Sequence, residues 1–187
     1  TSQIEGKDAS VEIEVSADDR NGETEFRYVI YDAENTPVAL AKTKDKKVSL
    51  KLKDVHLWNG RKDPYLYTAV AEIVEKKEVL DRISARFGCR SFEIHPEKGF
   101  ILNGVPYPLR GVSRHQDRWE IGNALLPEHH LEDMDFICEM GANTIRLAHY
   151  QHDQYFYDLC DERGMIVWAE IPYISRHMPE GNKNTIS

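Results

Sequence analysis

Three short apolar runs, each ending in polar or charged residues, constrain the fold of this chain more than any other feature. They cover about residues 108–113, 143–148 and 165–170, and two amphipathic segments separate them. Such an alternation is typical of β-α-β units, in which the strands are parallel and the crossovers are right-handed. Because ligands bind at the carboxyl ends of parallel strands, we expect the polar residues that end the runs to gather at one edge of a sheet.

The two intervening segments carry the start and stop signals of helices. The first opens at Leu126-Pro127, where proline is tolerated in the first turn, and ends before Gly141. The second covers about residues 154–163, with Asp153 in the N-cap position and Gly164 as its stop. The order of elements from residue 108 onward is therefore predicted to be β-α-β-α-β.

Residues 1–95 follow a different pattern, that of short strands without intervening helices. β-Branched or aromatic residues alternate in part over six stretches, which are residues 11–17, 25–33, 37–44, 46–52, 65–74 and 79–93. Strands at this spacing are typical of an antiparallel sandwich of the immunoglobulin type. We therefore expect two domains, a β-sandwich over residues 1–95 and an α/β domain over residues 96–187.

Composition and charge narrow the classes of function. The formal net charge of −8 argues against binding to a nucleic acid and is compatible with a neutral sugar. No apolar run approaches the roughly 18 residues of a membrane helix, so no membrane partner is expected. The first residues also lack the basic and apolar parts of a signal peptide. Because a processed chain would lack them too, the compartment stays open. The odd number of cysteines, without a C-x-x-C pair, predicts buried free thiols at Cys89, Cys138 and Cys160.

Polar and aromatic groups at the three strand ends are the candidate site residues. They are Arg114, His115, Arg146, His149, Trp168 and Glu170. Arginine holds a carboxylate bidentately and fixes its orientation. Imidazoles hydrogen-bond to hydroxyls, and an indole face stacks on the apolar face of a sugar ring. Together these groups suit a polyhydroxylated neutral substrate.

Other interpretations of single residues stay open. Glu170 alone could cap a following helix or pair with a lysine. A zinc site formed by His149, His152 and Glu170 is an alternative, although no established ligand spacing supports it. His129 and His130 are predicted to lie in solvent on the outer face of the first helix.

Several motifs in the same order resemble the β-galactosidases of glycoside hydrolase family 2. The motifs are residues 109–115, 141–150, 159–164 and 168–172, with residues 57–58, 63–67, 88–92 and 100–106 upstream. The resemblance implies that residues 1–95 are the family's immunoglobulin-like middle domain. Residues 96–187 would be the first three β-strands and two helices of its (β/α)8 TIM barrel. Such barrels need about 250 residues, so we expect most of the barrel to lie outside this chain.

The resemblance also implies a mechanism and roles for residues. Similar enzymes are retaining glycosidases, in which two glutamates ~5–5.5 Å apart act as acid/base and nucleophile. In the family they lie on later strands, the first in an Asn-Glu motif, and no asparagine here is followed directly by glutamate. The resemblance thus implies that this chain holds no catalytic carboxylate and is inactive alone. By the same resemblance, His115 and His149 contact the sugar and Arg146 orients the nucleophile.

The sugar is expected to be a β-galactoside, because residues 114–118 and 122–125 resemble bacterial β-galactosidases most. A β-glucuronidase or β-mannosidase of the same family is the alternative, since one fold hosts all three activities. A non-catalytic carbohydrate-binding or interaction module, or a purely structural pair of domains, is the rival from another class.

Two further expectations concern metals and association. Some relatives bind magnesium just after the third strand through a Glu-x-His pair. In the corresponding stretch, residues 173–177, the glutamate is absent and His177 is displaced by one position. We therefore expect no metal and no other cofactor in this chain, and a magnesium ion in the whole protein stays an open alternative. Three barrel strands leave two unpaired edges, so we expect the chain either to self-associate through them or to come from a longer chain that was cut.

Overall fold

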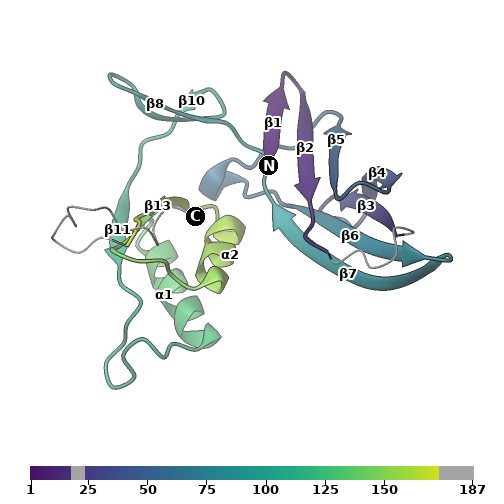
Figure 1. Ribbon diagram of the computed structural model, residues 1–187. Helices are drawn as coiled ribbons and strands as arrows, with labels where there is room; N and C mark the ends of the chain where they lie inside the picture. Colours follow the sequence, from purple (N-terminus) through teal and green to yellow (C-terminus); the bar gives the residue numbers. More distant parts are fainter. Residues whose placement is uncertain (18–23, 173–187) are drawn as a thin grey trace, which may run out of the picture. The chain divides into compact units, whose positions relative to one another are not determined.

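The computed structural model describes residues 1–17 and 24–172, which form two compact units. The first unit comprises residues 1–59 and 63–107. The second comprises residues 60–62, a short 3-10 helix, and the chain from residue 108 onward. Figure 1 shows the strands of the first unit and the mixed strands and helices of the second.

Two of the three antiparallel sheets of the first unit form an immunoglobulin-like β-sandwich. One sheet has the order β1-β2-β5 and consists of β1 (Ser2–Glu5), β2 (Asp8–Glu14) and β5 (Lys47–Leu52). The other has the order β4-β3-β6-β7 and consists of β3 (Glu25–Tyr31), β4 (Pro37–Thr43), β6 (Tyr67–Glu75) and β7 (Glu78–Phe87). The sandwich predicted from the strand spacing is confirmed.

Alternation along the strands builds the core of this sandwich. Successive side chains of a strand point to opposite faces, so every second residue is directed inward. Phe26, Tyr28 and Ile30 of β3 are fully buried and pack in one cluster with Val11 and Leu52 of the other sheet. Burial of large apolar side chains stabilises the folded chain by roughly 1.5–3 kcal/mol each.

The single strand expected over residues 79–93 is two strands in the structure. β7 ends at Phe87, and β8 (Phe92–His95) belongs to a separate small sheet with β9 (Gly99–Leu102) and β10 (Val105–Pro106). Between these two strands, the backbone of Cys89 forms an isolated parallel β-bridge with Leu57. The Cys89 carbonyl accepts a hydrogen bond of 2.8 Å from the Trp58 amide. The pairing of β7 with β6 ends at Phe87, before this long-range contact, which local propensity does not reveal.

The second unit contains a parallel sheet whose strands are connected by helices. Its elements are β11 (Gly111–Arg114), α1 (Pro127–Glu139), β12 (Thr144–Leu147), α2 (Gln154–Arg163) and β13 (Ile166–Ala169). The sheet order is β11-β12-β13, and both pairs are parallel. The predicted β-α-β-α-β order is therefore confirmed, and it is the start of a TIM barrel.

The helices end at the residues that the sequence indicates. The Asp153 carboxylate accepts a hydrogen bond of 2.8 Å from the Tyr155 amide and caps the N-terminus of α2. Gly164 follows α2 with a φ of 73°, and Gly141 follows α1 with a φ of 77°. Both glycines adopt the left-handed conformation that stops a helix without steric strain.

Side chains of both helices cover one face of the parallel sheet. Met134 of α1 and Phe156 of α2 are fully buried against Ile145 and Leu147 of β12. We call this the helix-covered face, and the opposite face of the sheet is the open face. Successive side chains of each strand therefore lie alternately on the helix-covered face and on the open face. A candidate site residue must lie on the open face.

The three cysteines are free thiols, as predicted. Cys89 and Cys160 are buried and Cys138 is partly buried. Burial raises the pKa of the Cys160 thiol to about 12, so it stays protonated at neutral pH. In the part of the chain that the structure describes, no helix is long and apolar enough to cross a membrane.

Candidate active site

One row of side chains crosses the open face of the parallel sheet. The register places Ser113 of β11, Arg146 of β12 and Trp168 of β13 side by side. Arg146 alternates with the buried Ile145 and Leu147, so its side chain lies on the open face. The Arg146 guanidinium donates a hydrogen bond of 3.3 Å to the Ser113 hydroxyl. Trp168 is 66% exposed and adds a flat apolar surface to the row.

The Glu170 carboxylate joins the ends of β12 and β13. Its Oε1 atom accepts a hydrogen bond of 2.7 Å from Arg146 Nε and lies 2.7 Å from a terminal guanidinium nitrogen. Its Oε2 atom accepts a hydrogen bond of 2.7 Å from the backbone N–H of His149. The hydrogen bond from this backbone N–H is the main cause that lowers the pKa of the Glu170 carboxyl group. Arg146 lowers it further. Glu170 is therefore ionised at neutral pH.

Two imidazoles from adjacent strand ends lie close together. The ring centroids of His115 and His149 are 5.2 Å apart. The Nδ1 atom of His149 is also 3.4 Å from Glu170 Oε2. The loops after β11 and β12 are tied together, because the Tyr150 hydroxyl accepts a hydrogen bond of 2.8 Å from the Gln116 amide. The structure thus brings His115, Arg146, His149, Trp168 and Glu170 to one edge of the sheet.

Arg114 does not lie with these residues. It is paired in register with the buried Leu147, so its side chain is on the helix-covered face and is 5% exposed. Its guanidinium donates hydrogen bonds of 2.9 and 2.8 Å to the Asp133 carboxylate and lies 3.9 Å from the Phe156 ring centre. Arg114 is therefore not placed to bind the substrate, as was expected, because its register with Leu147 directs its side chain to the helix-covered face.

Two buried histidines also accept hydrogen bonds from Arg114. Its guanidinium donates to Nδ1 of His130 at 3.0 Å and to Nδ1 of His152 at 3.2 Å. Because both Nδ1 atoms accept, both rings are neutral with the proton on Nε2. Burial, reinforced by the charge of Arg114, lowers the pKa of both histidines.

The prediction that His130 lies in solvent is wrong, because the residue is 2% exposed, whereas His129 is partly buried. His152 bonds to Arg114 and, at 3.4 Å, to the Ala148 carbonyl, and is not directed toward a common ligand with His149 and Glu170. Among the described residues, no group of three His, Cys, Asp or Glu side chains could hold a metal ion. The stretch considered for magnesium, with His177, lies outside the described residues.

Ser113 and Tyr150 belong to this site but were not singled out in the sequence. Alternation places Ser113 on the face opposite Arg114, so only the register that buries Arg114 assigns Ser113 to the site. No sequence signal identifies Tyr150, whose hydroxyl meets an amide 34 residues away in the chain.

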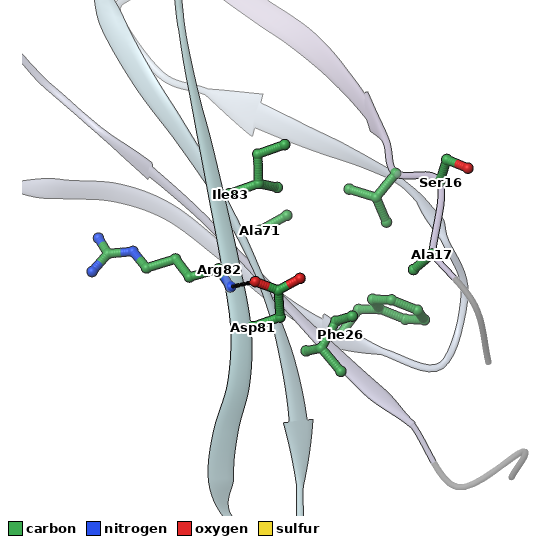
Figure 2. Close-up of a pocket in the computed structure, with 9 residues that line it drawn as sticks. Ser16, Ala17, Phe26, Ala71, Asp81, Arg82 and Ile83 are labelled. Carbon is green, nitrogen blue, oxygen red and sulfur yellow. Dashed lines mark hydrogen bonds between the residues drawn. The ribbon is translucent and has the colours of Figure 1, made fainter. Parts of the chain in front are cut away.

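A cavity of about 410 Å³ lies in the β-sandwich, but unlike the strand ends it is lined mostly by apolar side chains. It is lined by Val15, Ser16, Ala17, Phe26, Ala71, Ile73, Asp81, Arg82 and Ile83. Figure 2 shows that apolar side chains border it and that the Asp81 carboxylate accepts a hydrogen bond from the Arg82 backbone N–H, at 2.8 Å. The clustered arginine, histidines and carboxylate at the strand ends are therefore the better candidate for chemistry.

Comparison with known proteins identifies the family. Residues 1–90 match the model of glycosyl hydrolases family 2, and residues 92–187 match the TIM barrel domain of that family. A β-glucuronidase of Bacteroides fragilis is 48% identical over 118 residues, which are 63% of this chain and 17% of that protein. The β-galactosidase large subunit of Lactobacillus helveticus is 37% identical over 64% of this chain and 19% of its own length.

A solved structure shares the fold over almost the whole chain. The FMN-binding β-glucuronidase from Facaelibacterium prausnitzii L2-6 is 44% identical, with a TM-score of 0.89, and the match covers 94% of this chain and 28% of that one. The chain thus spans about a fifth of the length of the curated relatives that it matches. It belongs to glycosyl hydrolases family 2 and consists of the family's immunoglobulin-like sandwich followed by the start of its TIM barrel.

Proposed function

We propose that the whole protein is a retaining β-glucuronidase and that this chain supplies part of its sugar-binding site. The observation that carries the proposal is the 48% identity to the Bacteroides fragilis β-glucuronidase. The 44% identity to the β-glucuronidase from Facaelibacterium prausnitzii points the same way. The comparisons favour this activity over the β-galactosidase activity expected from local motifs.

β-Galactosidase is the second candidate, because the Lactobacillus helveticus β-galactosidase large subunit is 37% identical over 64% of this chain. Both activities use the same reaction. One glutamate protonates the leaving oxygen while the other attacks the anomeric carbon, and water then releases the sugar from the enzyme. We place both glutamates in later strands of the barrel, outside this chain.

The residues of this chain act on the sugar and on the nucleophile. His115 and His149 hydrogen-bond to sugar hydroxyls, and these bonds strengthen as charge develops at the ring in the transition state. Trp168 packs its exposed indole face against the ring. Arg146, which is already fixed by Glu170 on the open face, orients the nucleophile carboxylate.

The experiment that tests the proposal compares three substrates with the full-length protein. We expect kcat/KM for a chromogenic β-glucuronide to exceed that for the β-galactoside and the β-mannoside at least 100-fold. NMR should show that the released sugar first has the β configuration. A preference for the β-galactoside would support the second candidate, and no turnover of any substrate would leave a binding module as the better explanation.

His149→Ala gives the first site-directed prediction. Because His149 contacts the sugar most strongly in the transition state, we expect kcat/KM to fall about 100-fold. The matched control is His95→Ala, which removes a partly buried histidine of the first unit. Unchanged kcat/KM in His149→Ala would contradict the placement of the sugar at this strand edge.

A further inference from the structure

We propose that Glu170 is a positioning residue, whose carboxylate holds the Arg146 guanidinium and the His149 backbone in the arrangement that receives the sugar. This inference rests on the proposed glycosidase function. It assigns to Glu170 neither contact with the substrate nor transfer of a proton.

Three nitrogen atoms of the protein lie within 2.7 Å of the Glu170 carboxylate oxygens, and a fourth lies nearby. Oε1 faces two guanidinium nitrogens of Arg146, both at 2.7 Å. Oε2 faces the backbone nitrogen of His149 at 2.7 Å and its Nδ1 atom at 3.4 Å. A carboxylate offers about four lone-pair positions, so little capacity is left for a sugar hydroxyl.

The backbone at His149 shows what the carboxylate holds in place. His149 has a φ of 70°, and the Tyr150 amide donates a hydrogen bond of 3.0 Å to the Ala148 carbonyl. A bond from residue i+2 to residue i around a central residue of positive φ is the rare and strained form of the γ-turn. Such a conformation persists in a residue with a Cβ only when its surroundings hold it. The hydrogen bond from His149 N to Glu170 Oε2 supplies that constraint.

The turn determines the direction of the His149 side chain. With the turn in place, the His149 ring lies beside that of His115, at 5.2 Å between centroids. The same carboxylate pairs with Arg146 on the open face of the sheet, so one group orders two functional side chains. Displacement of such groups by about 1 Å is sufficient to slow catalysis about 100-fold.

The ionisation of Glu170 agrees with this role. The His149 N–H and Arg146 lower its pKa, whereas a general acid at neutral pH needs a raised one. A carboxylate that is charged at neutral pH and accepts hydrogen bonds from two neighbours is suited to orient them.

The test is Glu170→Gln in the full-length protein, assayed with the glycoside that the wild type hydrolyses best. Glutamine keeps the size and one carbonyl oxygen, so it accepts from either Arg146 or His149 but not from both. We expect kcat to fall 30- to 300-fold while KM changes less than 3-fold. A raised KM with unchanged kcat would make Glu170 a substrate-binding residue, and a loss beyond 10⁵-fold would make it a catalytic one; either result overturns the inference.

Asp135→Asn is the matched control. Asp135 forms an exposed ion pair of 2.9 Å with Arg163 between the two helices of the same unit. Loss of this carboxylate should leave kcat and KM within 2-fold of the wild type. A parallel loss of kcat in this variant would show that any broken ion pair in the unit impairs the enzyme, which would overturn a specific role for Glu170.

A double-mutant cycle separates positioning from general stability. If Glu170 acts through His149, Glu170→Gln should lower kcat at most 10-fold in the His149→Ala background. A purely structural role would lower the melting temperature and give the same loss of kcat in both backgrounds. That additivity would overturn the inference.

Hydrogen exchange keeps this inference separate from the proposed function. We expect the His149 amide to exchange faster in Glu170→Gln than in the wild type and in Asp135→Asn. A wild type without glycosidase activity would defeat the proposed function, while this measurement would still test the link to the turn. Equal exchange of the amide in all three proteins would overturn the positioning role.

Discussion

At the scale of single residues, Arg114 and Arg146 have opposite surroundings in one parallel sheet. Arg146 shares the open face with Ser113 and Trp168 and is 39% exposed, whereas Arg114 is paired with Leu147 and is 5% exposed. A buried guanidinium without partners would strongly destabilise the fold. Asp133 and two neutral histidines supply those partners. Arg114 therefore stabilises the helix-covered face of the sheet, opposite the candidate site.

The two glycines that end the helices give a prediction about stability. Both have a left-handed φ, but a Cβ at Gly164 would lie 2.2 Å from the Gly60 carbonyl oxygen, whereas one at Gly141 would have nothing within 4 Å. We expect Gly141→Ala to lower the free energy of unfolding by about 1–2 kcal/mol, from the backbone alone. Gly164→Ala should lower it by about 3 kcal/mol, because the overlap with Gly60 adds to that penalty.

Urea unfolding of the two glycine variants and the wild type measures this difference. Gly141→Ala is the matched control, since it changes the same backbone conformation without the overlap. Equal losses in the two variants would contradict the close approach of Gly164 to Gly60.

At the scale of elements, α1 and the loop before α2 carry the two histidines that hydrogen-bond to Arg114. His130 lies in α1, and His152 lies just before α2. Both accept hydrogen bonds from Arg114, which requires neutral rings. The packing of the helices on the sheet therefore depends on the protonation of these residues.

This dependence predicts the direction of the change in stability with pH. The pKa of each histidine is lowered in the folded chain from 6.5, so below pH 6.5 the unfolded chain binds more protons. The free energy of unfolding is therefore fully retained above pH 6.5 and falls as the pH decreases below it. Each histidine contributes at most about 1.4 kcal/mol per pH unit.

Urea unfolding at pH 7.5 and 5.5 measures the effect. His152→Gln keeps an acceptor for Arg114 but does not titrate, so this variant should lose less stability between the two pH values. His115→Gln, which replaces an exposed histidine of the same unit, should behave as the wild type does. An identical pH dependence in all three proteins would contradict the role of His152.

At the scale of the whole molecule, this chain spans only part of the length of its relatives. It covers 17% of the Bacteroides fragilis β-glucuronidase and 28% of the solved β-glucuronidase that it resembles. The β11 and β13 strands each have one pairing partner among the described residues, and Trp168 is 66% exposed on the open face. Unpaired strand edges and exposed apolar faces favour association with further chain.

We therefore predict that the 187-residue chain, produced alone, self-associates and hydrolyses no β-glycoside. The edges of the parallel sheet would pair between copies, and both catalytic glutamates would be missing. Sedimentation velocity and the chromogenic assay measure the two properties. A monomer with a cooperative melt of the second unit would contradict the first, and turnover that disappears in Glu170→Gln would contradict the second.

The sequence by itself determined most of the elements, because they depend on local signals. Helical spacing with Asp153 and Gly164 at its ends defines α2, and alternation with turn residues indicates the sandwich. The strand ends that carry the candidate residues were also predictable, since apolar runs that end in polar residues are a local pattern. His115, Arg146, His149, Trp168 and Glu170 were identified in this way.

Only the tertiary structure decided which of these side chains meet. The face to which Arg114 points follows from the register of β11 with β12, and the burial of His130 follows from a partner 16 residues away. The strained turn at His149 depends on a carboxylate that arrives 21 residues later in the chain. Alternation and capping act between neighbours in sequence, whereas these contacts exist only after separate elements have packed together.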